Sequence, residues 1–280
     1  DSINGSVFPI FPDENGIVWL GIMSVGLDRF DPATGRLTHF EYDAAKPDGL
    51  ASPVVLNILR DSHGVLWLAT ANGLDQYDEV NNRFIHHKLD DGNSNVFTAL
   101  YEDPSGTFWV GSMDGLYQFD RSAGQWHPVA KGADLAQSSP SVINNIFGAS
   151  NGDLWITTSG MGLYHFDPDQ GTFEHFKRDF EQPDSLASDI VLWAYEDRQN
   201  NLWLATTAGL NKLDLDTRQF ELYTEQQGLP NSFIYCIIPD QSGDFWLPTN
   251  FGLARFNPSA GTFQNFSVDD GLQSNEFNSN

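Results

Sequence analysis

The chain has 280 residues, enough for one large all-β domain or two ordinary domains. It carries 38 acidic and 14 basic residues, a net charge of −24, so its field repels nucleic acids and anionic membrane surfaces. No apolar run is long enough to insert this segment directly into a membrane. The single cysteine, Cys236, can form neither an internal disulfide nor a Cys-rich zinc site. We therefore expect no metal, no cofactor and no nucleic-acid partner.

Residues 7–40 show how one structural unit is built. Four apolar or alternating segments have the length of short strands, at 7–11, 17–20, 27–30 and 36–40. The segments between them are rich in Asp, Gly, Pro and Asn, and Asn15-Gly16 is a preferred hairpin pair. Four short strands joined by such turns predict an antiparallel meander.

The same unit recurs six times along the chain. Each copy reads D-x-x-G-x-φ-W-φ-G/A-T-x-x-G-L-x-x-φ-D, with φ apolar, and the tryptophans recur every 42 to 48 residues, at Trp19, Trp67, Trp109, Trp155, Trp203 and Trp246. This period is typical of a propeller or a solenoid. Because no helical period is present, we predict an all-β fold: one β-propeller domain over residues 1–280, made of four-stranded antiparallel blades.

The repeated residues have structural explanations. The tryptophan is flanked by apolar residues on both sides, so it is expected to lie in a strand buried on both faces and to fill the space between blades. The repeated aspartates Asp13, Asp61, Asp103, Asp197 and Asp240 are expected to cap turns rather than to bind metal. Two departures stand out: Ala149 replaces the aspartate of the fourth repeat, and Pro248 replaces the small residue of the sixth.

The two ends of the sequence also follow the repeat. Residues 1–7 align with 184–190, which precede the fifth repeat, and residues 271–277 align with 228–233, which precede the sixth. We therefore expect the chain to begin within a connection between blades and to end where a seventh repeat starts.

The segment Asp103-Pro-Ser-Gly-Thr-Phe-Trp-Val-Gly-Ser-Met-Asp-Gly-Leu-Tyr-Gln-Phe-Asp120 resembles the two-component regulator propeller repeat at nearly every fixed position. This family occurs in the extracytoplasmic sensor regions of bacterial hybrid histidine kinases and some diguanylate cyclases. The resemblance implies a ring that is typically seven-bladed and a periplasmic location. It also implies an inner-membrane protein with kinase or cyclase activity elsewhere, whose full length could form a homodimer.

The first strand of each blade is expected to be innermost and to line the channel. Aligned on the tryptophans, these strands place Pro9, Asn57, Ala99, Asn145, Trp193 and Cys236 at one position. The preceding position holds Phe8, Leu56, Thr98, Asn144, Leu192 and Tyr235. A sugar needs an aromatic face and amides that donate and accept hydrogen bonds. We predict Trp193 and Tyr235 as platforms and Asn57, Asn144, Asn145 and Asn231 as polar contacts; hydrogen bonding of these groups to channel water is the structural alternative.

The longest connections all join the fourth strand of one blade to the first strand of the next, at 42–53, 130–141, 177–189, 224–232 and 268–278. Long loops can vary whereas tight turns cannot, so this side is expected to carry function. An acidic run such as 179–184 could hold Ca²⁺, but the absence of EF-hand ligand spacing favours a solvated surface.

Three functions are compatible with such a propeller. The first is a sensory domain without catalytic residues that binds a small, saccharide-like ligand on the long-loop side. The second is a scaffold for protein interactions. The third, a propeller lyase such as a streptogramin lyase, would need a catalytic histidine with a metal or acid partner on the loop side, where the sequence places none. Fold alone does not separate the three.

Overall fold

The computed structural model describes residues 6–89, 94–131, 142–182 and 184–276. In these residues the regular structure is β-strand, apart from two single-turn 3₁₀ helices. The strands form six antiparallel sheets of four strands, each ordered as a simple meander. The chain divides into two compact units, Asp1–Ile146 with Ser279–Asn280, and Phe147–Asn278. No helix in the described residues has the length and apolar character needed to cross a membrane.

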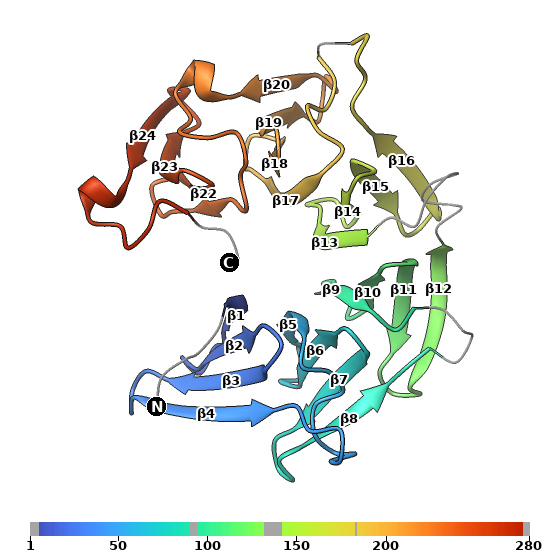
Figure 1. The fold of residues 1–280 in the computed structure, drawn as a ribbon. Helices are drawn as coiled ribbons and strands as arrows, with labels where there is room; N and C mark the ends of the chain where they lie inside the picture. The colour runs from blue at the N-terminus through green and yellow to red at the C-terminus, as the bar shows by residue number, and fades with distance from the viewer. Residues whose placement is uncertain (1–5, 90–93, 132–141, 183, 277–280) are drawn as a thin grey trace. The chain divides into compact units, whose positions relative to one another are not determined.

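The first unit contains three complete sheets (Figure 1). The first sheet consists of β1 (Val7–Pro12), β2 (Val18–Ile22), β3 (Gly26–Asp31) and β4 (Arg36–Glu41). The second consists of β5 (Val55–Arg60), β6 (Leu66–Thr70), β7 (Gly73–Asp78) and β8 (Arg83–His87). The third consists of β9 (Phe97–Glu102), β10 (Phe108–Ser112), β11 (Gly115–Asp120) and β12 (Gln125–Lys131). Within this unit β1, β5 and β9 gather on one side and β4, β8 and β12 form the opposite edge.

The fourth sheet begins at the end of the first unit and continues into the second. It consists of β13 (Val142–Gly148), β14 (Leu154–Ser159), β15 (Leu163–Asp167) and β16 (Thr172–Phe176). The fifth consists of β17 (Val191–Glu196), β18 (Asn201–Thr206), β19 (Gly209–Asp214) and β20 (Phe220–Tyr223). The sixth consists of β21 (Ile238–Pro239), β22 (Phe245–Thr249), β23 (Gly252–Asn257) and β24 (Thr262–Phe266). The 3₁₀ helices η1 (Glu225–Gln227) and η2 (Val268–Asp270) follow the fifth and sixth sheets.

These sheets are propeller blades. Each runs outward from its first strand, and neighbouring blades within a unit pack face to face. The predicted all-β propeller fold with six four-stranded blades is confirmed. In each blade the turns after the first and third strands lie at one end, the tight-turn face. The turn after the second strand and the connection to the next blade lie at the other end, the long-loop face.

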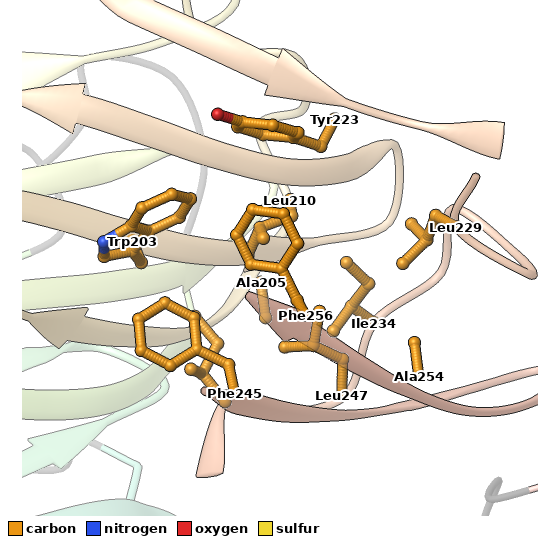
Figure 2. Packing of buried hydrophobic residues seen from close by; sticks show 11 residues of the cluster. Trp203, Ala205, Leu210, Tyr223, Leu229, Ile234, Phe245, Leu247, Ala254 and Phe256 are labelled. Atoms are coloured by element: carbon orange, nitrogen blue, oxygen red, sulfur yellow. The ribbon is translucent and has the colours of Figure 1, made fainter. Parts of the chain in front are cut away.

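The hydrophobic cores lie between consecutive blades, as the tryptophan positions predicted. Trp203 of β18 is 1% exposed, and its ring centroid lies 5.3 Å from that of Phe245 and 5.4 Å from that of Phe256, both in the next blade. Figure 2 shows these rings within the cluster shared by the fifth and sixth blades. Trp19 contacts Tyr77 of the second blade in the same way. Trp246 is the exception, because its side chain is only partly buried.

The repeated aspartate does more than the predicted turn cap, since it also binds the tryptophan. In the second blade, Oδ1 of Asp61 accepts hydrogen bonds from the amides of His63 and Val65 at 3.0 and 2.9 Å. Its Oδ2 accepts the indole N–H of Trp67 at 2.9 Å. The same arrangement recurs at Asp13, Asp103 and Asp197. Each carboxylate therefore links a surface turn to the core of the blade.

The two departures from the repeat have local consequences. In the fourth blade, where Ala149 replaces the aspartate, the indole nitrogen of Trp155 is buried and has no hydrogen-bond partner among the residues that the structure describes. In the sixth blade, Pro248 lacks the N–H that a ladder needs. Its carbonyl still accepts the amide of Tyr235, but the first strand shrinks to the two residues of β21, preceded by an isolated bridge between Ile234 and Thr249.

Truncation of an inter-blade tryptophan tests the packing. Replacement Trp203→Ala removes a fully enclosed ring and is expected to lower the free energy of unfolding by about 3–5 kcal/mol. Trp246→Ala is the matched control, because it removes the same residue type at the same repeat position. Since Trp246 is only partly buried, its removal should lower the free energy of unfolding clearly less. Urea unfolding measures both. Equal losses for the two variants would show that burial between blades is not what the tryptophan contributes.

Restoring the missing carboxylate provides a second test. Ala149→Asp is expected to raise the free energy of unfolding by about 1 kcal/mol, since it supplies an acceptor for the buried indole N–H of Trp155. Ala149→Asn is the control, because its amide oxygen can cap the turn but its NH₂ group cannot accept the indole proton. Thermal and urea unfolding of the three proteins compare them. A gain from Asn as large as that from Asp would contradict the assigned indole bond.

Candidate functional site

The first strands present the predicted ligand-binding residues through a recurring irregularity. In β5 the pairing register shifts between Val55 and Asn57, and in β17 it shifts between Val191 and Trp193. The third blade shows the same shift at Thr98, and a longer one occurs in β1. Such β-bulges re-aim a side chain. In the first strands that carry a bulge, it thus determines where the side chains of the two aligned residues point.

In the second, third and fifth blades the residue opposite the bulge is small. Asn57 lies opposite Ala69, and Trp193 lies opposite Ala205. In the third blade the equivalent residue is Gly111, where a Cβ atom would lie 2.7 Å from Cγ2 of Ile143 in the next first strand. A larger residue would force neighbouring first strands apart. The G/A position of the repeat is therefore explained by close approach of the inner strands.

In the first unit the predicted asparagines lie on two first strands separated by a third. Asn57 is half-buried on β5, and its carboxamide makes no hydrogen bond to any residue that the structure describes. Asn144 and Asn145 are half-buried on β13, where Oδ1 of Asn145 accepts the amide of Ile146 at 3.0 Å. Between these two strands, the hydroxyl of Thr98 on β9 donates to the carbonyl of Ile143 at 2.6 Å.

In the second unit the two predicted aromatic platforms have different surroundings. Trp193 on β17 is partly buried, with its ring edge-on to Phe147 at 5.2 Å between centroids. Tyr235 lies against Phe233 at 4.8 Å and donates its hydroxyl to Oδ1 of Asn250 at 2.5 Å. The described residues show no ring contact between Trp193 and Tyr235. They are two separate platforms, not one stack.

Asn231 has a structural role in the connection that precedes the sixth blade. Its Oδ1 accepts the amide of Phe233 at 2.9 Å, which forms a local turn. In the same connection, the carboxylate of Glu225 accepts hydrogen bonds from the amide and the hydroxyl of Ser232. The Nδ2 group of Asn231 makes no hydrogen bond to the described residues and can donate to a ligand, while Oδ1 has one acceptor position already in use.

The long connections are tied to the blades they precede. In the connection 42–53, the amide of Ala51 donates to Oδ2 of Asp75 at 2.8 Å, and the carbonyl of Pro47 lies 3.0 Å from Nε2 of His86. In 177–189, the amide of Ala187 donates to Oδ1 of Asn211, which occupies the same repeat position as Asp75. The predicted connection 130–141 lies outside the described residues after its first two positions. These anchors give the long-loop face a defined shape where the structure describes it.

Two histidines of the outer strands pair with aspartates of the third strands. His86 is half-buried, and its Nδ1 lies 2.7 Å from Oδ1 of the fully buried Asp75. That hydrogen bond raises the pKa of His86 above 6.5, against the opposing effect of burial. His39 forms the same pair with Asp28 in the first blade at 2.8 Å. Among the described residues, no three His, Cys, Asp or Glu side chains gather in a way that could hold a metal ion.

Comparison with known proteins agrees with the repeat. Residues 49–72, 91–114 and 185–208 match the family described as two component regulator propeller. The predicted resemblance is confirmed, and the chain carries repeats of this kind. A search of curated proteins found no match.

Solved structures share the fold at low sequence identity. One is the extracellular domain assigned to a one component system, BT4673, of B. thetaiotaomicron, with a TM-score of 0.63 and 19% identity over 98% of this chain and 43% of that one. Another is the extracellular domain assigned to a hybrid two component system, BT3049, of the same organism, with a TM-score of 0.53 and 21% identity over 96% and 41%. This chain therefore spans less than half the length of either domain.

An enzyme also shares the fold. A catalytically inactive virginiamycin B lyase from Staphylococcus aureus, solved with quinupristin, matches with a TM-score of 0.74 and 15% identity over 98% of this chain and 88% of that one. At such identities the likeness shows a common propeller architecture and carries no activity across.

The pair of His86 and Asp75 predicts a pH dependence of stability. Because the pKa of His86 is raised in the folded chain, its charge stabilises the fold fully below pH 6.5, and this contribution is lost as the pH rises through the raised pKa. The difference in unfolding free energy between the parent and His86→Gln should therefore shrink from pH 6 towards pH 8. Repeating the comparison in an Asp75→Asn background is the control. A pH-dependent difference that survives there would assign it to another group.

Proposed function

We propose that this chain is the ligand-binding propeller of a periplasmic sensor protein of the two-component type, anchored in the inner membrane through its other parts. The domain is a binding module without catalysis of its own, and kinase or cyclase activity belongs elsewhere in the full-length protein. The matched repeats support this, as do fold relatives that are described as extracellular domains of one component and hybrid two component systems.

The proposed ligand is a small saccharide bound on the long-loop face, at the ends of the first strands. The observation that carries this proposal is the bulged first strand, which leaves the Asn57 carboxamide and the Trp193 indole N–H without hydrogen-bond partners among the described residues. An amide that can donate and accept, and an aromatic ring that is partly open, are what a sugar ring and its hydroxyls require. Tyr235, Asn144, Asn145 and Asn231 complete the proposed contacts.

Two alternatives remain distinct from this proposal. A lyase would need a histidine with an acid or metal partner that is free to act on a ligand at the long-loop face. His86 does pair with the acid Asp75 beside the connection 42–53, but its other ring nitrogen lies 3.0 Å from the carbonyl of Pro47, so both ring nitrogens are already engaged. Likeness of fold to virginiamycin B lyase does not supply that site. A protein-interaction scaffold is the outcome to adopt if no small ligand binds.

Calorimetric titration with neutral, acidic and sulfated oligosaccharides tests the proposal. We expect at least one to bind, and the double variant Trp193→Ala with Asn145→Ala to weaken that binding by tenfold or more, since it removes a platform and an amide. Asn151→Ala, which alters an exposed asparagine of a tight turn, is the control and should bind as the parent does. Undiminished binding by the double variant would reject the site, and no binding by the parent would favour the scaffold.

A further inference from the structure

A second candidate site lies on the tight-turn face, away from the long loops. Within the first unit, a pocket of about 600 Å³ opens between the second and third blades. His63 and Gln76 line it from the second blade, and Gln118, Arg121 and His127 line it from the third. Binding sites for small molecules commonly enclose about 300–1,000 Å³, so this pocket has room for one.

The two walls of this pocket are fixed to one another by a buried ion pair. Nη1 of Arg121 donates to Oδ2 of Asp61 at 2.7 Å, the same oxygen that accepts the Trp67 indole N–H. Nη2 of Arg121 donates to the carbonyl of Gly106 and lies 2.6 Å from Oε1 of Glu102. Both members of the pair are largely enclosed, with side chains 15% and 2% exposed. Because this ion pair holds the two walls in place without a ligand, little conformational entropy is lost when a ligand binds.

The groups left to meet a ligand are side-chain amides and imidazoles. Gln76 offers its NH₂ group, because its Oε1 already lies 3.3 Å from Nε2 of His87. Gln76 and Gln118 occupy the same position on β7 and β11, opposite Trp67 and Trp109 in the strand register, and both are half-buried. His127 lies opposite Gln118 on β12 and is exposed. Amide and imidazole groups both donate and accept hydrogen bonds, as hydroxyl groups do.

The charged groups around the pocket are already engaged. Arg121 is bound as described, and the carboxylate of Asp120 accepts hydrogen bonds from the amides of Ser122 and Ala123 and from the Ser122 hydroxyl. An anionic ligand would be repelled, because it would approach the carboxylates of Asp61 and Asp120 on a chain of net charge −24. A bare cation would find Oδ2 of Asp61 bound by Arg121 and Oδ1 of Asp120 bound by the turn amides.

The neighbouring groove shows that this lining of amides and imidazoles is specific to one pair of blades. A smaller pocket of about 400 Å³ occupies the corresponding place between the first and second blades. There, Arg29 stands where Gln76 stands in the larger pocket, and Arg60 and Glu79 form an ion pair at 3.0 Å on its wall. The repeat thus builds both grooves, and individual side chains give them different chemistry.

We infer that the pocket between the second and third blades is a binding site for an uncharged, polyhydroxylated small molecule of mono- or disaccharide size. It is separate from the site proposed on the long-loop face and does not depend on it. The hydrogen bonds would come from Gln76, Gln118, His63 and His127, and the buried rings of Phe108 and Phe119 also line the pocket.

Nuclear magnetic resonance of the whole chain, labelled with ¹⁵N, tests this inference. Maltose, cellobiose and lactose are titrated separately while the side-chain amide signals of Gln76 and Gln118 are followed. We expect a saturable shift with at least one sugar, weakened tenfold or more by Gln118→Ala and by His127→Ala. Trp193→Ala should leave the shift unchanged, which separates this site from the long-loop site.

The matched control is Gln264→Ala, because Gln264 pairs with Arg255 on the sixth blade as His127 pairs with Gln118 on the third. It should bind as the parent does. Urea midpoints establish that each variant is folded, and Gln118→Asn replaces Gln118→Ala if the latter is unstable. The inference is overturned if none of the three sugars gives a saturable shift, or if the shift survives in both pocket variants. Tighter binding of glucuronate than of glucose would overturn the uncharged class of ligand.

Discussion

The hydrogen bond between the turn aspartate and the tryptophan indole is the interaction on which the first, second, third and fifth blades depend. A tryptophan large enough to fill the space between two sheets brings a donor into that space, and a buried donor without an acceptor costs about 1–3 kcal/mol. The carboxylate six residues earlier supplies the acceptor while its other oxygen binds two amides of the turn. Turn geometry and core packing are therefore set by one side chain.

The same carboxylate also joins one blade to the next. Oδ2 of Asp13 accepts Arg60 of the second blade at 3.0 Å, and Oδ2 of Asp61 accepts Arg121 of the third. Burial raises the pKa of Asp61, but hydrogen bonds from the Trp67 indole and the Val65 amide, together with Arg121, outweigh that effect and keep the pKa below its usual value. The carboxylate thus remains ionised where three partners need it charged. A motif that looks local in the sequence is one that holds consecutive blades together.

The sequence was sufficient for the architecture and insufficient for the chemistry of individual side chains. Period and turn residues predicted six blades of four strands, because these depend on patterns that every repeat carries. They did not reveal that the aspartate binds the indole, since spacing alone does not show where a side chain points. Nor could they show that Asn231 and the Tyr235 hydroxyl are already engaged locally. The pocket between the second and third blades was missed because Gln76 and His127 belong to different repeats and to no motif.

The substitution at Ala149 makes the joint between the fourth and fifth blades different in kind from those of the first unit. Among the described residues, the side-chain contacts between the two sheets lie on the outside: Arg218 with Glu174, both more than 40% exposed, and Glu196 with the amide of Ser150. The amides of Gly160 and Gly162 also bind the carbonyl of Asp189, in the connection between these blades. Exposed ion pairs of this type contribute little free energy to holding the two blades together. The joint consequently rests on aliphatic and aromatic side chains, whose attraction has no preferred direction. A small shear displacement between these two sheets would therefore strain no buried ion pair of the kind that Arg121 forms with Asp61.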